Sequence, residues 1–431
     1  MARELNKELI KVTGLSSFGT LIEWYDFFII ASVAATVWPL LYYPKSVGVA
    51  ASVAASIATY ASAFFSRPIG AMIFGHYGDK LGRKPMLIWT LGITSLGMIG
   101  LALTPTYATI GFIAPILLLI FRLVEGIGLG GEWGGAASVI TEFSLRSRKV
   151  GYWTSWIQAT TAFGIVLSIL GTLIARELMP ASEFDNYGWR ILIGIGAIVL
   201  IIGAIVRYYI FESPQFQKIL KEGQVLKAPL SVAFKSDWKR IILSGLCWPF
   251  IVTLVAIEMY PTGLSYMLEL KANLLTAYSA VLVGNLVQAL AIILGGALSD
   301  RVNRRKLILL ISNVLSILAS VTFFPLLNFG NAMWFTIAYS FLGFSIGLGF
   351  GTVAALLTEL YPTKYRYTAS GFSFQLGGVI AGIYSSLLLP TVILISHGLV
   401  KAWPLIEVLS VSVCVIALIA NLLLKESKET E

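Results

Sequence analysis

The sequence predicts an all-α integral membrane protein, with twelve transmembrane helices in two pseudo-symmetric six-helix bundles. Three observations predict it: the composition, the number of long apolar segments, and a repeat. Of the 431 residues, 57% are hydrophobic and only 12% are charged. Soluble globular domains carry about 25% charged residues, so this composition is typical of a membrane protein.

A transmembrane helix needs about 20 predominantly apolar residues. Twelve segments meet this requirement, at residues 12–40, 50–77, 85–103, 110–143, 150–178, 189–211, 240–268, 274–298, 307–327, 332–361, 367–395 and 402–424. The polar stretch 212–239 divides them into an N-terminal bundle (1–211) and a C-terminal bundle with a short cytoplasmic tail (240–431). We expect this stretch to be a cytoplasmic linker.

The distribution of basic residues predicts the orientation in the membrane. Lysine and arginine gather at both termini and in alternate loops, so both termini of this multi-pass protein are expected in the cytoplasm, at the plasma membrane. The net charge of +9 therefore does not indicate a nucleic-acid partner. The charged start of the chain leads into a full-length span, unlike a cleaved signal peptide.

No phosphate-binding loop or metal-binding motif is found, so no cofactor or metal is expected. Because there is no recognisable ATPase motif, any uphill work would have to come from an ion gradient.

Two stretches of the first half return in the second. GHYGDKLGRK (75–84) reappears as GALSDRVNRRK (296–306), which matches Asp79 with Asp300. TEFSLRSRKVG (141–151) reappears more loosely as TELYPTKYRYTASG (358–371), which matches Glu142 with Glu359. The offsets are nearly equal, which indicates a duplicated six-helix unit with its site between the halves.

The segment FRLVEGIGLGGEWGGAASVITE (121–142) places three charges inside an apolar span. Each charge costs roughly 2.5 to 3.5 kcal/mol at the centre of a membrane helix. Arg122, Glu125 and Glu132 must therefore face a protein interior or a cavity. They form either a structural ion pair or a pathway for protons or substrate. Glycines at helical spacing leave one face bare for a close neighbour.

GHYGDKLGRK resembles the cytoplasmic signature of the major facilitator superfamily. Four further stretches resemble its metabolite:proton symporter family: GTLIEWYDFFI (19–29), SRPIGAMIFGHYGD (66–79), GGEWGGA (130–136) and FESPQF (211–216). The resemblance covers the whole chain and implies the major facilitator fold and transport by alternating access. Two positions depart from the pattern. Glu125 stands where many relatives have glutamine, and Asn303 replaces the second glycine of the repeated loop.

The resemblance also implies a conformational latch on the cytoplasmic side. Asp79 would cap the helix that starts near Tyr367, and Arg83 would meet Glu142. In the second half the same contacts would be made against helix 5, by Asp300, Arg304 and Glu359. These contacts would stabilise the outward-facing state. Alternatively, the basic residues of the loop only fix topology.

Proton coupling is expected on the first helix, where Glu23 and Asp26 share a face. Two carboxylates this close in a low-dielectric interior cannot both ionise cheaply. Arg122 on the neighbouring fourth helix is the expected counter-ion. The residues predicted for proton coupling are Asp26, Glu23, Arg122, Glu125 and Glu132.

Residues that could bind a polar substrate are Arg122, Arg67, Glu258, Tyr260, Gln288, Gln375 and Trp133. Each has a packing alternative, and Glu258 could instead be solvated near the outer face. The protein is predicted to be a transporter, not an enzyme, that couples a small polar metabolite to protons. An organic acid is the expected substrate, and an osmolyte (proline or betaine) or sugar symporter or a uniporter is the alternative. A membrane-embedded enzyme is the less favoured class. The expected partners are the metabolite, protons and the lipid bilayer, around a monomer.

Overall fold

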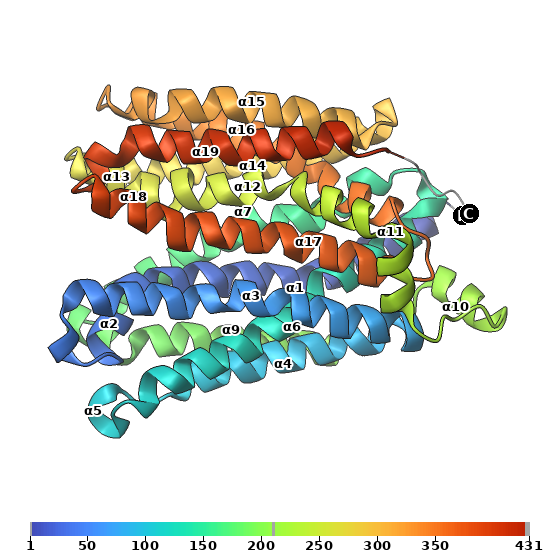
Figure 1. Ribbon diagram of the computed structural model, residues 1–431, viewed down its shortest axis with the longest axis horizontal. Helices are drawn as coiled ribbons and strands as arrows, with labels where there is room; N and C mark the ends of the chain where they lie inside the picture. Colours follow the sequence, from blue (N-terminus) through green and yellow to red (C-terminus); the bar gives the residue numbers. More distant parts are fainter. Residues whose placement is uncertain (1, 209–211, 427–431) are drawn as a thin grey trace.

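The computed structural model describes residues 2–208 and 212–426, and no strand occurs among them. The N-terminal half contains α1 (Ala2–Thr36), α2 (Trp38–Leu41), η1 (Lys45–Val47), α3 (Val49–Leu81), α4 (Arg83–Leu103), α5 (Tyr107–Ile110), α6 (Ile113–Ser144), η2 (Leu145–Ser147), α7 (Val150–Leu178), α8 (Ala181–Glu183), η3 (Phe184–Gly188) and α9 (Trp189–Arg207). The long helices run side by side along the long axis of the molecule (Figure 1).

A short helix, α10 (Pro214–Lys221), follows the first half in the chain and lies at one end of the molecule (Figure 1). The C-terminal half contains α11 (Pro229–Leu246), α12 (Pro249–Leu254), η4 (Val255–Gly263), α13 (Leu264–Glu269), α14 (Leu274–Val302), α15 (Arg305–Leu327), α16 (Ala332–Glu359), α17 (Arg366–Ile383), η5 (Tyr384–Leu388), α18 (Leu389–Ile395) and α19 (Leu399–Leu423).

Eleven helical stretches of the described chain are long and apolar enough to cross a membrane. The one predicted span not among these eleven is the second in chain order, α3. This helix has 33 residues, and its serines, threonine and Arg67 make it more polar than the other spans. The predicted all-α membrane architecture is confirmed. The seventh and eleventh spans are interrupted, because each contains a π-helical segment, η4 and η5 respectively.

The predicted linker 212–239 is largely helical. The helix α11 begins inside it, at Pro229, and Asp237 breaks the helical geometry (φ −128°, ψ 19°) before the span proper. The predicted end of the first bundle at residue 211 lies outside the described residues.

The two halves meet along equivalent helices. The second span, α3, packs against α17, the eleventh, and the fifth, α7, packs against α14, the eighth. In Figure 1 α7 consequently lies among the helices of the second half. This exchange of contacts is what a duplicated unit related by a pseudo-twofold axis produces.

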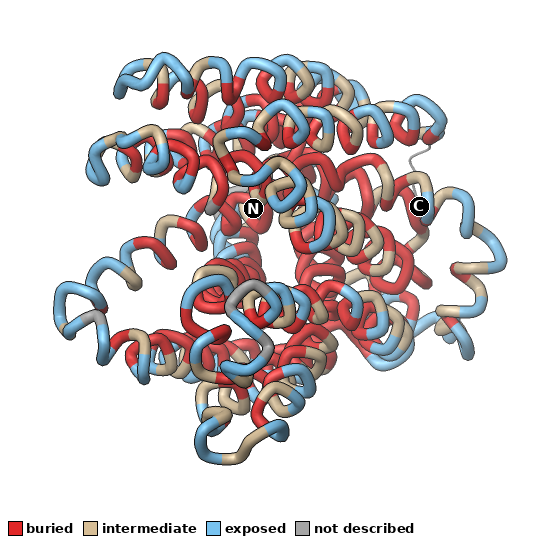
Figure 2. Tube along the Cα trace, turned by 60° about the vertical axis from the view of Figure 1, so that its left-hand side comes forward, coloured by how far each residue is buried: buried red, intermediate tan, exposed pale blue. Residues whose placement is uncertain are grey.

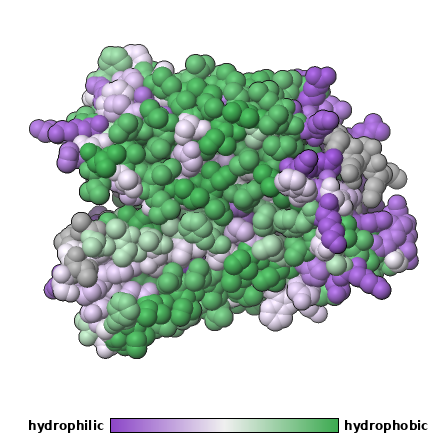
Figure 3. All heavy atoms as spheres, in the orientation of Figure 1, coloured by the Kyte–Doolittle hydropathy of each residue, from purple (hydrophilic) through white to green (hydrophobic). Residues whose placement is uncertain are grey.

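On the face shown in Figure 3, apolar residues cover the middle of the bundle and hydrophilic residues gather at its two ends. Side chains on the outside of α9 show the reason: Ile198, Ile202 and Ile205 are 59%, 51% and 60% exposed. Such a surface is stable in lipid. Buried residues occupy the centre of the bundle (Figure 2). We call the end with α10 and the α3–α4 and α14–α15 turns the basic end, and the end with α2, α5 and α13 the far end.

Glycines bring α6 against its neighbours. A side chain at Gly130 would collide with the carbonyl of Arg67 on α3, and one at Gly134 would come within 2.7 Å of Gly371 on α17. The glycine-rich face of α6 therefore contacts helices of both halves. This packing determines the direction in which the charged side chains of α6 point.

Candidate functional site

The two carboxylates of α1 are buried, and each has its own arginine. Glu23 Oε1 lies 3.0 Å from Arg67 Nη1. Asp26 Oδ2 lies 3.7 Å from Arg122 Nη1, whereas Glu125 Oε1 lies only 2.6 Å from the same nitrogen. Arg122 was expected to serve both acids of α1, and this expectation is corrected: Glu23 pairs with Arg67, and Glu125 is the nearest partner of Arg122.

Several atoms of this cluster have no hydrogen-bond partner. They include both oxygens of Asp26, Nη2 of Arg122, Oε2 of Glu125 and Nη2 of Arg67. Leaving a buried polar group unpaired costs about 1–3 kcal/mol. The unpaired atoms can therefore bind a proton, a water molecule or a substrate group.

A cavity of about 520 Å³ lies between the halves on the far side of this cluster. Its lining comes from α1 and α3 on one side and from η4, η5 and α18 on the other, and includes Phe27, Phe28, Tyr60, Tyr260, Thr262, Ser385 and Ser386. The Phe28 and Tyr260 rings meet across the halves, with centroids 5.9 Å apart.

An aromatic wall separates the cavity from the charges. Arg122 Cζ lies 5.0 Å from the centroid of the Tyr60 ring, and its Nε donates to the Tyr60 carbonyl at 3.2 Å. Arg67 Cζ lies 5.7 Å from the Phe27 ring. The charged cluster is therefore directly behind two residues that line the cavity.

The predicted substrate residues are not all brought together. Tyr260 lines the cavity, but Glu258 is absent from the lining and is fully buried. The alternative that Glu258 is solvated near the outer face is therefore wrong. Gln288 is buried at the contact of α14 with α16, where its backbone faces Gly347. These residues do not form one binding site in this conformation.

Trp133 and Gln375 contribute to a contact between the halves instead. The rings of Trp133 and Phe374 stack with centroids 3.7 Å apart, and Trp248 stacks on the other face of Phe374 at 4.2 Å. Gln375 Nε2 donates to the Gly130 carbonyl at 3.2 Å. Trp133 lies closer to the basic end of α6 than Arg122 does, so this aromatic stack lies between the charged cluster and that end.

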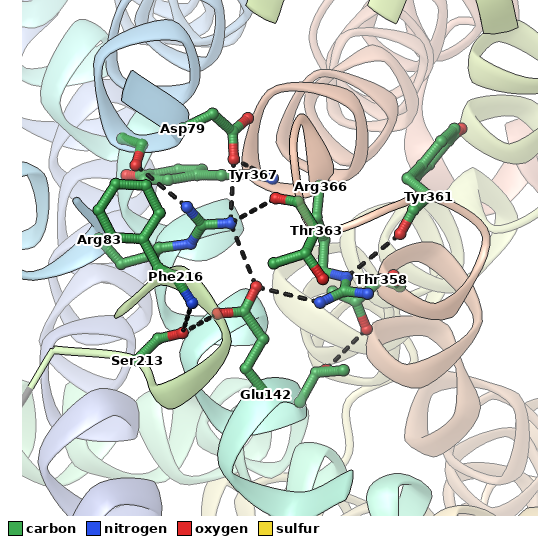
Figure 4. Close-up of polar contacts among 12 residues, drawn as sticks. Asp79, Arg83, Glu142, Ser213, Phe216, Thr358, Tyr361, Thr363, Arg366 and Tyr367 are labelled. Carbon is green, nitrogen blue, oxygen red and sulfur yellow. Dashed lines mark hydrogen bonds and ion pairs between the residues drawn. The ribbon is translucent and has the colours of Figure 1, made fainter. Parts of the chain in front are cut away.

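At the basic end, Asp79 caps the first turn of α17 (Figure 4). Its carboxylate accepts from Thr368 N at 2.8 Å, Thr368 Oγ1 at 2.7 Å and Tyr367 N at 3.3 Å. Figure 4 shows it beside Tyr367 and Arg83. Arg83 Nη2 lies 3.1 Å from Asp79 and 3.2 Å from Glu142. An anion at a helix N-terminus is stabilised by the free N–H groups and the helix dipole.

Glu142 joins this network to the second half. Its Oε1 lies 3.0 Å from Arg366 Nη1, and its Oε2 accepts from the Ser213 hydroxyl. Arg83 Nη2 also donates to the Thr363 carbonyl at 2.7 Å. The network is thus shared by α3, α4, α6, the segment before α10 and the start of α17.

The second half repeats the arrangement against α7. Asp300 accepts from Gly151 N at 2.8 Å and Tyr152 N at 2.7 Å. The cation of this copy is Arg305, which lies 2.7 Å from Asp300 and 3.1 Å from Glu359. The prediction of Arg304 is wrong, because Arg304 is exposed. One extra residue separates the helices here: Asn303 (φ 59°) and Arg304 both precede α15, whereas Gly82 alone precedes α4.

The predicted proton-coupling residue Glu132 lies in a separate ion pair. Arg207 donates to both of its oxygens, at 2.6 and 2.8 Å, and Thr90 donates at 2.8 Å. Arg207 is 2% exposed and was missed, because its position at the end of an apolar segment predicted a surface residue. The acids predicted inside the membrane outnumber the arginines predicted there, and this imbalance could have indicated a further buried arginine.

Two glutamates that cap helices were also missed. Glu212 accepts from Arg83 N and Lys84 N, both at 3.1 Å, at the start of α4. Glu426 accepts from Arg305 N at 2.6 Å at the start of α15. A repeated Glu-Ser dipeptide, at 212–213 and 426–427, was the signal in the sequence.

A duplicated helical bundle with a cavity between its halves is the architecture of a secondary transporter. The sequence model of the Major Facilitator Superfamily matches residues 17–386 and 280–430, and the chain belongs to that superfamily. It is a multi-pass membrane transporter of metabolites, not an enzyme.

Its relatives include three transport proteins of Escherichia coli (strain K12). The chain is 35% identical to the inner membrane metabolite transport protein YhjE, over 86% of this chain and 84% of the relative. It is 29% identical to the shikimate transporter, over 96% and 94%, and 31% identical to the proline/betaine transporter, over 88% and 77%.

Solved structures share the fold. The proton:xylose symporter XylE bound to 6-bromo-6-deoxy-D-glucose superposes with a TM-score of 0.78, at 17% identity, over 98% of this chain and 97% of that chain. The inward-open conformation of XylE from E. coli superposes with a TM-score of 0.65, at 16% identity, over 98% and 97%.

Proposed function

We propose that this protein is a proton-coupled symporter that carries a small polar metabolite, of the organic-acid class, by alternating access. One observation carries the proposal. Asp26 is buried behind the cavity wall, beside Glu125 and 3.7 Å from Arg122, and no donor hydrogen-bonds to either of its carboxyl oxygens.

The proton step follows from competition for Arg122. Glu125 holds its Nη1 at 2.6 Å, whereas Asp26 lies 3.7 Å from the same nitrogen, so in this state Asp26 is the more weakly paired of the two carboxylates. The more weakly paired carboxylate in a low-dielectric interior is the one that binds a proton. When Asp26 releases this proton to the cytoplasmic side, the negative charge of its carboxylate can draw Arg122 away from Glu125. The protonated and ionised forms of Asp26 would thus select two arrangements of α1 and α6.

Alternating access requires the contacts at the basic end to break. Asp79, Arg83 and Glu142 hold α3, α4 and α6 to α17, and the second copy holds α14 and α15 to α7. The cavity lies toward the far end. In the proposed cycle this is the outward-facing state, and Asp79, Arg83, Glu142, Asp300, Arg305 and Glu359 form the latch.

The surroundings of the cavity favour a substrate of low charge. None of the described residues that line the cavity is charged, and both arginines behind it already have carboxylate partners. Arg122 Nη2 remains unpartnered, and it is the group we assign to the carboxylate of a monoanion. Transport of an organic acid with one such group would resemble the function named for the shikimate transporter.

A zwitterionic osmolyte is the second candidate. Phe27, Phe28, Tyr60 and Tyr260 contribute aromatic rings to the cavity, and aromatic faces bind quaternary ammonium groups. The relatives named as proline/betaine transporters agree with this candidate.

We place the protein in the plasma membrane as a monomer, with the basic end and both termini in the cytoplasm. The concentration of lysine and arginine at that end supports this orientation.

Uptake into proteoliposomes tests the function. Shikimate, glycine betaine, proline and xylose would each be offered with and without an imposed inward proton gradient. Accumulation of shikimate that depends on the gradient is the expected result, and accumulation of betaine would select the second candidate. Equal uptake with and without the gradient would show that transport is not coupled to protons.

A further inference from the structure

Glu258 differs from the other buried carboxylates of the described chain in having no arginine or lysine within salt-bridge distance. Each of the others has one, and they are Glu23, Asp26, Asp79, Glu125, Glu132 and Glu142. Glu258 is 0% exposed and belongs to the half of the molecule for which the proposed function has no proton site.

The surroundings of Glu258 are polar but not cationic. Ser320 on α15 donates to Oε1 at 2.5 Å, while Oε2 has no hydrogen bond. Ser410 on α19 approaches the same carboxyl, and its buried hydroxyl also lacks a partner of its own. The titratable groups that face Glu258 are Glu407 and Cys414 on α19, while the hydroxyl of Tyr339 on α16 donates to the neighbouring Met259 carbonyl at 3.0 Å.

This environment determines the charge of Glu258. An isolated buried carboxylate loses its hydration without compensation, and such a group binds a proton instead of remaining ionised. The carboxyl therefore holds a proton, with Ser320 and Ser410 available as hydrogen-bond partners.

Glu258 also lies on the segment that can connect it to the cavity. The π-helical η4 departs from helical geometry at Tyr260 (φ −154°, ψ 129°), immediately before Pro261, which has no N–H to donate. Ala256, Tyr260 and Thr262 of this segment line the cavity, whereas Glu258 is directed toward Ser320. A π-helical interruption in a helix frequently marks a functional site.

We propose that Glu258 is a second proton-binding site, in the C-terminal half, which exchanges its proton with the cavity when η4 rearranges. The site consists of the Glu258 carboxyl with the Ser320 and Ser410 hydroxyls. Its role in coupling rests on the proposed symport, but its occupancy by a proton does not.

Infrared spectroscopy of the reconstituted protein tests the occupancy without any substrate. At neutral pH the difference spectrum between the wild type and Glu258→Gln should show loss of one protonated-carboxyl C=O band. The exposed Glu269 on α13 is the matched control, and Glu269→Gln should leave that band unchanged. Ser320→Ala keeps the carboxyl but removes a hydrogen bond, so it should shift the same band even if Glu258→Gln folds poorly. Loss of a carboxylate band in Glu258→Gln, or no shift in Ser320→Ala, would overturn the proposal.

Proton counting tests the role in transport. In vesicles loaded with a pH indicator, addition of shikimate or glycine betaine should move fewer protons per substrate for Glu258→Gln than for the wild type or Glu269→Gln. An unchanged ratio would overturn the coupling role. If wild-type uptake moves no protons at all, the proposed symport fails, while the infrared result still decides whether Glu258 is a proton site.

Discussion

Thr141 and Thr358 occupy equivalent positions in the two repeats, and their hydroxyl oxygens lie 2.7 Å apart in a hydrogen bond between the halves. The pseudo-twofold axis therefore passes near this pair. Glu142 and Glu359 follow these threonines, and each binds the arginine that begins the third span of its own half. The closed basic end is thus built twice around one axis, and it has to open as a unit.

Removing the charge of Asp79 should open that end. Asp79→Asn loses a charged acceptor of three hydrogen bonds, each worth roughly 1.5–3 kcal/mol. We expect the population open at the basic end to rise more than tenfold. Distances between spin labels placed on α3 and α17 would measure it. Lys80 is an exposed neighbour, and Lys80→Ala should leave the distances unchanged. Equal distances in Asp79→Asn and wild type would mean that the loop only fixes topology.

The register of the second copy predicts that two adjacent arginines differ strongly in how much they contribute to stability. Arg305→Ala leaves Asp300 and Glu359 without their cation, and breaking a buried pair costs about 3–5 kcal/mol. Arg304→Ala changes an exposed side chain and should stay within about 0.5 kcal/mol. Thermal unfolding in detergent should separate the two variants by several degrees. A larger loss for Arg304→Ala would contradict the assigned register.

The Glu132–Arg207 pair should behave as a structural unit. Glu132→Gln leaves the guanidinium buried without its carboxylate, and we expect a loss of about 3–5 kcal/mol. Adding Arg207→Met to this variant removes the uncompensated charge and should restore part of the stability. A double-mutant cycle measures the coupling. Additive losses would show that the two side chains stabilise the protein independently.

Glu125→Gln should change the pH dependence of transport. Without the Glu125 charge, Arg122 becomes available to Asp26, and the resulting pair favours the ionised form of Asp26. More acid is then needed to load the proton, so proton-driven uptake should shift to lower pH, by roughly one unit or more. The matched substitution Glu23→Gln affects the pair with Arg67 and should shift the profile less. Identical profiles for wild type and Glu125→Gln would refute the competition for Arg122.

The helices could be predicted because they depend on local pattern, whereas the helix caps of Asp79 and Asp300 were expected from the family resemblance. Span 150–178 coincides with α7, and Asp79 and Asp300 both cap helices. Partners that come from distant segments could not be read in this way. Arg366 joins Glu142, and Arg207 joins Glu132, only because the helices pack side by side. The error at Arg304 came from one extra loop residue: the stretch 296–306 is one residue longer than 75–84, and matching Arg83 with Arg304 did not allow for it.

The central claim is that Asp26 carries the coupled proton. Steady-state accumulation of substrate in proteoliposomes under an imposed proton gradient tests it most directly, with wild type and Asp26→Asn compared side by side. We expect the wild type to concentrate substrate inside the vesicles, and Asp26→Asn to exchange substrate but to accumulate markedly less of it. Accumulation by Asp26→Asn to the wild-type level would contradict the account.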